Sequence, residues 1–138
     1  MSDRGDMISA RPLPLPDDAT FEFWAACQRH ELRMQRCVAC AKVRFPPRPM
    51  CPRCQSFESE WPKMSGKGTL YSFVIAHPPV LPAFAEKAPY PVVLVALDED
   101  PTLRMIGTLV AGEPSIGAPV EVAFEQSGEM TLPTWRMV

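Results

Sequence analysis

Several features that mark enzymes and membrane proteins are missing from this sequence. It has no run of about 18 apolar residues, so it predicts no membrane-spanning helix. Only two histidines occur, and there is no G-x-S-x-G, H-E-x-x-H or complete P-loop motif, which predicts no independent catalysis. Residues 1–6 carry two aspartates and lack the apolar stretch of a signal peptide, so we expect a cytoplasmic protein.

The composition limits the folds that are open to the chain. Its 138 residues are 46% apolar and 22% charged, which is enough to bury the core of one domain, with or without a small appendage. Seventeen prolines leave little room for long helices, because proline lacks the backbone N–H that a helix needs. The composition therefore favours short strands joined by fixed turns.

Charge is distributed unevenly along the chain. The formal net charge of −2 is a poor fit to a general nucleic-acid binder. Residues 29–53 nevertheless hold seven basic residues and one acidic residue, a net charge of +6, between flanks of −3 and −5. This basic middle is either a solvated face or a docking surface for phosphate or for an acidic partner.

The cysteines carry the clearest chemical signal. Two C-x-x-C pairs, separated by ten residues, suit the four thiolates of a tetrahedral metal site. Because no signal peptide is visible, a disulfide framework is the weaker interpretation. We expect Zn²⁺, while a rubredoxin-like iron site with similar spacing stays open. The predicted ligands are Cys37, Cys40, Cys51 and Cys54.

Three residues near these pairs lead to further expectations. Cys27 lies in a predicted helix, where we expect a small buried side chain; a fifth ligand, or catalysis with His30, is the alternative. Ala41 and Gln55 follow the two pairs at turn positions where glycine is usual. A left-handed residue other than glycine costs about 1–2 kcal/mol, so the turns are expected to be strained or differently shaped.

The N-terminal half contains two further predicted segments. Alternating prolines predict an extended arm over residues 1–16. In residues 17–34, Asp17 and Asp18 can cap a helix that runs from about Ala19 to Met34. Aromatic side chains on two faces of this helix predict contacts with the ribbon and the core, or with another subunit.

The C-terminal half predicts a β domain. After the metal-binding ribbon of residues 35–60, residues 61–138 contain five strand-like runs: 69–76, 90–97, 103–110, 120–124 and 130–135. Five short strands with a wide first loop and no long helix predict a small barrel of the OB type, with a sandwich as the competing fold. The fold class is therefore mainly β.

A specific string of residues joins the ribbon to the first strand of the β domain. After the aromatic helix it reads Gln35-Arg36-Cys37-x-x-Cys40, Phe45-Pro46-Pro47-Arg48, Cys51-Pro52-x-Cys54, Trp61 and Ser65-Gly66-Lys67-Gly68-Thr69-Leu70-Tyr71-Ser72-Phe73. This order resembles the DUF35 family over about residues 17–134, which implies a rubredoxin-like zinc ribbon followed by a five-stranded OB-fold. Ala41 departs from the glycine expected after the first cysteine pair.

The resemblance also implies a function. Family members are commonly small partners of thiolase-like enzymes, including thiolases, HMG-CoA synthases and retro-aldolases, whose large subunit holds the catalytic groups. The small subunit scaffolds the complex and helps bind acyl-CoA. We therefore expect the protein to bind a coenzyme A thioester in addition to Zn²⁺. The phosphates of the thioester would be bound by basic side chains. The candidates are Arg36, Lys42, Arg44, Arg48 and Lys67.

Two alternatives from other function classes stay open at this point. Zinc ribbons and OB-folds also bind single-stranded nucleic acid, although the charge of −5 on residues 54–138 argues against this. A rubredoxin-like electron carrier would hold iron and would be coloured.

Overall fold

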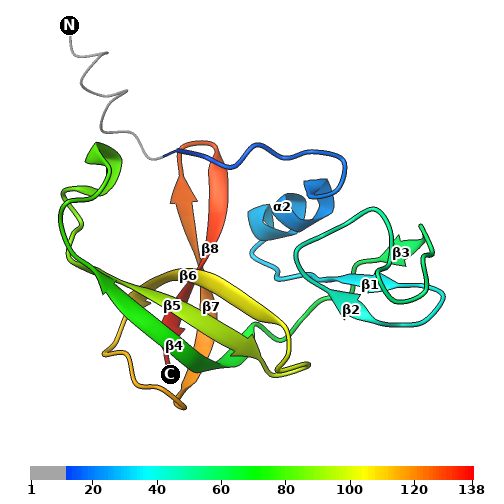
Figure 1. Ribbon diagram of the computed structural model, residues 1–138. Helices are drawn as coiled ribbons and strands as arrows, with labels where there is room; N and C mark the ends of the chain where they lie inside the picture. Colours follow the sequence, from blue (N-terminus) through cyan, green and yellow to red (C-terminus); the bar gives the residue numbers. More distant parts are fainter. Residues whose placement is uncertain (1–11) are drawn as a thin grey trace, which may run out of the picture.

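The computed structural model describes residues 12–138, in which a three-stranded sheet and a five-stranded barrel flank one α-helix (Figure 1). Of the predicted arm, residues 1–11 lie outside the described part. Residues 12–16 form no regular secondary structure, and the side chain of Leu15 is 91% exposed. Within residues 12–138, no helix has the length and apolar character that a membrane span requires.

The α-helix, α2, runs over Phe21–Gln28. Asp17 fixes the turn that precedes it, because its carboxylate accepts hydrogen bonds from the N–H of Ala19 and from the N–H and hydroxyl of Thr20. The backbone carbonyl of Asp17 also accepts a hydrogen bond from the N–H of Phe21, at 2.8 Å. The N-cap residue is Thr20, and no side chain caps the helix, so the predicted capping by Asp17 and Asp18 was wrong. Asp17 instead stabilises the turn that leads into the helix.

The helix is much shorter than predicted. It ends before His30, whose φ of 59° lies in the left-handed region that a right-handed helix cannot pass through. The prediction that the helix continues to Met34 was wrong. Instead, the N–H of Met34 donates to the carbonyl of Pro62, and the carbonyl of Leu32 accepts from Met64. This segment therefore runs alongside residues 62–64.

Helix α2 buries one face and leaves part of another exposed. Phe23 is 4% exposed, and its ring lies 5.0 Å from the ring of Trp24 and 5.7 Å from that of Phe45 in the ribbon. The neighbouring Phe21 is 60% exposed. The helix thus packs against ribbon and core, as its aromatic pattern predicted, and still presents an aromatic side chain to solvent.

The ribbon sheet consists of β1 (Gln35–Cys37), β2 (Val43–Arg44) and β3 (Ser59–Glu60), in the order β2-β1-β3. Both pairings are antiparallel. Because the strands are so short, the sheet has little backbone hydrogen bonding of its own to stabilise the ribbon.

The barrel confirms the predicted OB-fold. Its strands close in the order β4-β5-β6-β8-β7, and the parallel pairing of β6 with β8 completes the ring. A sandwich would leave two separate sheets, so that alternative is excluded. The wide first loop carries a short 3₁₀ helix, η1 (Pro82–Phe84). The strands are β4 (Lys67–Ala76), β5 (Tyr90–Leu97), β6 (Arg104–Ala111), β7 (Pro119–Ser127) and β8 (Met130–Met137).

One continuous apolar core joins the helix, the segment after it and the barrel. Trp135 on β8 is fully buried in it, together with Leu32, Met34 and the buried barrel residues. Gly107 on β6 lies against the indole, where an added Cβ would approach Trp135 Cδ1 to 3.0 Å. Figure 1 shows α2 between the β7–β8 hairpin and the ribbon, where it connects the two β units.

Candidate metal centre

Two backbone turns of the same design present the four cysteines. In the first, Cys37 N–H donates to the carbonyl of Lys42, and Ala41 N–H donates to the carbonyl of Cys37, both at 2.9 Å. The second turn repeats this around Cys51, with Ser56 and Gln55 as partners at 2.8 Å. This repeated pattern makes each C-x-x-C pair a knuckle that points its sulfurs inward.

The residue after each knuckle adopts the conformation that glycine prefers. Ala41 has a φ of 66° and Gln55 a φ of 68°. The sequence left two possibilities, strained turns or turns of a different shape, and the structure has strained turns at both sites. Each left-handed side chain costs about 1–2 kcal/mol, which other interactions of the folded chain must offset.

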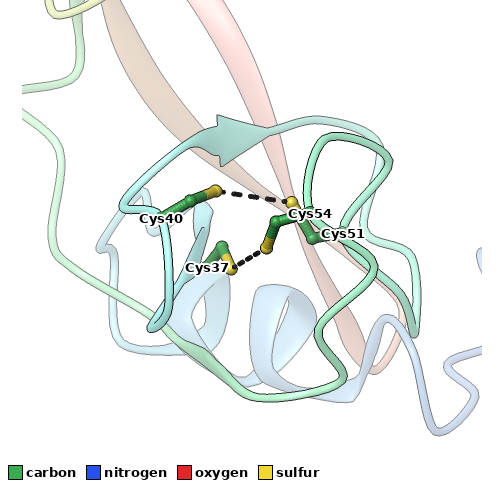
Figure 2. Close-up of side chains that lie close together, drawn as sticks. All are labelled: Cys37, Cys40, Cys51 and Cys54. Carbon is green, nitrogen blue, oxygen red and sulfur yellow. Dashed lines mark hydrogen bonds between the residues drawn. The ribbon is translucent and has the colours of Figure 1, made fainter.

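The four sulfurs converge on one point, as Figure 2 shows. All four Sγ atoms lie within 4.8 Å of one another. Across the knuckles, Cys37 Sγ lies 3.5 Å from Cys54 Sγ, and Cys40 Sγ lies 3.7 Å from Cys51 Sγ. Tetrahedral Zn²⁺ with Zn–S bonds of about 2.3 Å separates its sulfurs by about 3.8 Å, so the four side chains fit this ion.

The backbone of the knuckles favours the thiolate form that a metal requires. The N–H of Cys54 donates to the Cys51 sulfur and is the largest cause that lowers the pKa of Cys51 to about 6. The N–H of Cys40 likewise lowers the pKa of Cys37. Because metals bind the thiolate, these N–H groups prepare the site for a cation.

The fifth cysteine lies outside the cluster. Cys27 is fully buried in α2 within the apolar core, and burial raises the pKa of its thiol to about 12. A neutral thiol in this environment is a small apolar side chain. The prediction of a buried structural role for Cys27 is therefore confirmed, and the fifth-ligand and nucleophile alternatives lose their basis.

Two of the five basic candidates for phosphate binding already have partners. Arg36 on β1 donates from Nε to Glu60 Oε1 at 2.8 Å. Arg44 on β2 is only 4% exposed, and its Nη2 donates to the carbonyl of Arg48 at 2.9 Å. In this arrangement Arg44 does not face solvent, so burial removes it from the accessible basic surface.

The other three candidates are exposed, and two of them lie near the turn between β5 and β6. Hydrogen bonds from Thr102 hold the pKa of Asp100 below its usual range, and the charge of nearby Lys42 adds to this effect. The carbonyl of Lys67 accepts from Asp98 N–H at 3.0 Å in the same β5–β6 turn. Lys42 and Lys67 therefore flank one turn, while Arg48 lies on the loop between the knuckles.

A buried polar side chain that the sequence analysis missed supports that loop. Gln35 is 5% exposed, and its Oε1 accepts from the backbone N–H of Arg48 at 2.8 Å. Its Nε2 donates to Ser59 Oγ at 3.2 Å. A glutamine in a three-residue strand carries no sequence signal for this role, because the loop that it binds is fixed only in three dimensions.

Comparisons with known proteins agree with this geometry. The rubredoxin-like zinc ribbon domain of ChsH2 matches residues 24–60, and the C-terminal OB-fold domain of ChsH2 matches residues 61–125. A solved structure described as "Ltp2-ChsH2(DUF35) aldolase" includes a chain with a TM-score of 0.82 and 36% identity. The match covers 91% of this chain and 98% of that one.

Proteins from two different organisms are similar to this chain over most of its length. A "DUF35 domain-containing scaffold protein" of Methanocaldococcus jannaschii is 36% identical over 107 residues, covering 74% of this chain and 73% of the relative. A "Probable enoyl-CoA hydratase alpha subunit" of Thermomonospora curvata is 43% identical over 131 residues, 91% of this chain. The chain spans only 40% of the length of that hydratase subunit. With both domains matched in order, the chain belongs to the DUF35 family and has its rubredoxin-like zinc ribbon and OB-fold.

Proposed function

We propose that this protein is a scaffold subunit that binds a thiolase-like catalytic partner and helps hold its acyl-CoA substrate. The observation that carries the proposal is the match of ribbon, helix and barrel together to a chain of the Ltp2-ChsH2(DUF35) aldolase. Relatives named as a scaffold protein and as a hydratase alpha subunit also support a role within a larger assembly.

The metal site supports a structural role. Zn²⁺ would be held by Cys37, Cys40, Cys51 and Cys54, where it would supply the cross-link that the short ribbon strands lack. Four thiolates complete a tetrahedral shell and leave no position for a reacting water. We therefore assign the chemistry to the partner subunit and not to this chain.

For the acyl-CoA, we propose contacts from the three exposed basic residues Lys42, Arg48 and Lys67. Ammonium and guanidinium groups bind the phosphates of CoA through charge-assisted hydrogen bonds. Arg36 and Arg44 are left out, because Glu60 and the Arg48 carbonyl already engage them. Replacing Lys42 and Lys67 with alanine should weaken CoA binding by the assembled complex, while Arg36→Ala serves as the matched control.

Single-stranded nucleic-acid binding has little support from the barrel surface. An OB-fold reads nucleic acid mainly through strands that correspond to β5 and β6, using stacked aromatic rings in a basic groove. On the outer side of these strands lie Val92, Leu94, Ile106 and Thr108, with Arg104 as the basic residue. That surface is apolar and carries one cation, so it does not fit a polyanion.

Co-expression tests the proposal directly. The chain and the thiolase-like protein encoded nearest to it are co-expressed with one tag, and the product is analysed by size-exclusion chromatography with light scattering. We expect one hetero-oligomeric peak that survives dilution to micromolar concentration. Two separate peaks would contradict the scaffold function. Titration of each species with a labelled oligonucleotide at low salt tests the nucleic-acid alternative, for which we expect no salt-sensitive binding.

A further inference from the structure

The outer wall of the barrel over β4, β5 and β6 carries an apolar patch with a single cation. The strand register aligns three rows across this wall: Thr69, Ala96 and Arg104; Ser72, Leu94 and Ile106; and Val74, Val92 and Thr108. The bulge between Leu70 and Ser72 adds Tyr71 to the same face. We refer to these ten residues as the barrel patch.

The barrel patch is apolar at its centre and open to solvent. Ile106 is 70% exposed and Val74 is 62% exposed. Between them, with Ser72, Val92 and Leu94, lies a hollow of about 130 Å³. Large apolar side chains that cluster around a hollow on the surface are typical of sites where another protein binds.

The cation beside the hollow is held in place by an aromatic ring. Arg104 lies across the ring of Tyr71, with its Cζ 3.8 Å from the ring centroid. Ala96 on the strand between them has too short a side chain to block this contact. No Asp or Glu within residues 12–138 forms an ion pair with Arg104. Its guanidinium is thus oriented and free to pair with an incoming carboxylate.

From these features we infer that the barrel patch is the surface that docks the catalytic partner subunit, which rests on the scaffold function proposed above. The partner would insert an apolar side chain into the hollow and place a carboxylate against Arg104. A second copy of this chain does not fit. The ten residues include no acid, so a two-fold pairing of the patch would bury two guanidinium groups without partners.

Three variants test this docking surface against a matched control. Ile106→Asp puts a charge at the edge of the hollow, Arg104→Ala removes the cation, and Arg104→Glu reverses it. Ile116→Asp is the control, since Ile116 is 64% exposed in the loop of residues 112–118, outside the patch. Zinc content and melting temperature, which should match those of the wild type, verify that each variant is folded.

Affinity for the co-expressed thiolase-like subunit is the measurement. Ile106→Asp should raise Kd about tenfold or more, as expected for a residue in the centre of an interface. Arg104→Ala should raise Kd less and reduce its salt dependence, while Arg104→Glu should weaken binding further. Ile116→Asp should bind like the wild type.

Each contrary outcome has a distinct meaning. Wild-type affinity in folded Ile106→Asp and Arg104→Glu, or equal losses in Ile116→Asp, would overturn the docking surface while leaving the scaffold function intact. If the wild-type chain does not bind the thiolase-like subunit at all, both the docking surface and the scaffold function are refuted. A stable homodimer that Ile106→Asp dissociates would show that the patch binds a second copy instead.

Discussion

Gln35 and Arg44 face each other across the β1–β2 pair and hold the two backbone polar groups of one residue, Arg48. Gln35 Oε1 accepts from the Arg48 N–H, and Arg44 Nη2 donates to the Arg48 carbonyl. Both side chains are buried. They therefore fix the loop between the knuckles and set the distance between the two cysteine pairs.

The two side chains should respond differently to substitution. Gln35→Ala removes a buried acceptor and should lower the free energy of unfolding by about 1–2 kcal/mol. Arg44→Met should be neutral or stabilising by up to about 2 kcal/mol, because the Nε and Nη1 of Arg44 are buried without partners within residues 12–138. Denaturant unfolding of the zinc-loaded protein measures both. A loss in Arg44→Met as large as that in Gln35→Ala would contradict this account.

Glycine at the end of either knuckle should stabilise the ribbon. Ala41→Gly and Gln55→Gly remove the strain of a left-handed side chain, so each should raise the free energy of unfolding by about 1 kcal/mol. Ala39→Gly is the control, because Ala39 lies in the first knuckle without a positive φ and should gain nothing. Melting temperatures with saturating zinc provide the comparison, and equal gains in all three variants would refute the argument from backbone strain.

Replacing one of the four cysteines of the proposed zinc site should prevent metal binding but leave the barrel folded. Cys37→Ser leaves three thiolates, so the purified variant should contain much less zinc, and amides in β1 and β2 should exchange faster with solvent. Elemental analysis and hydrogen exchange measure these two effects. Cys27→Ala is the control. Cys27 packs in the apolar core, so this variant should contain as much zinc as the wild type. Full zinc content in Cys37→Ser would refute the four-cysteine site.

The turn before α2 should be sensitive to acid. Hydrogen bonds from Thr20 hold the pKa of Asp17 below its usual value of 3.8, so the folded state stabilises the carboxylate. This contribution is complete above the pKa of the unfolded chain and is lost as pH falls through the lower folded value. Asp17→Ala should therefore reduce the melting temperature at neutral pH, and this reduction should shrink as the pH falls through the lowered folded pKa of Asp17.

Asp18→Ala is the matched control for that experiment, because the Asp18 carboxylate accepts none of the hydrogen bonds at this turn. It should have nearly the wild-type melting temperature at neutral and at acidic pH. A difference between Asp17→Ala and the wild type that does not shrink in acid would show that packing, and not the carboxylate, stabilises the turn.

Much of the fold could be predicted from local patterns. Cysteine spacing predicted the cluster of four cysteines, because the geometry of a knuckle is set within a few residues of chain. The five barrel strands lie close to the predicted ranges, since alternating burial along a strand leaves a pattern with a period of two. The helix was predicted too long because His30 can adopt a left-handed φ, which composition alone does not reveal.

The sequence by itself determined which four cysteines cluster, the order of ribbon and barrel and the uneven distribution of charge. Only the tertiary structure decided which charges are available. It placed Arg44 beneath a loop, paired Arg36 with Glu60 and stacked Arg104 on Tyr71, with no ion pair to an acidic residue among residues 12–138. The reason is physical: a ligand set depends on residues close in sequence, whereas the exposure and pairing of a charge depend on which distant segments pack beside it.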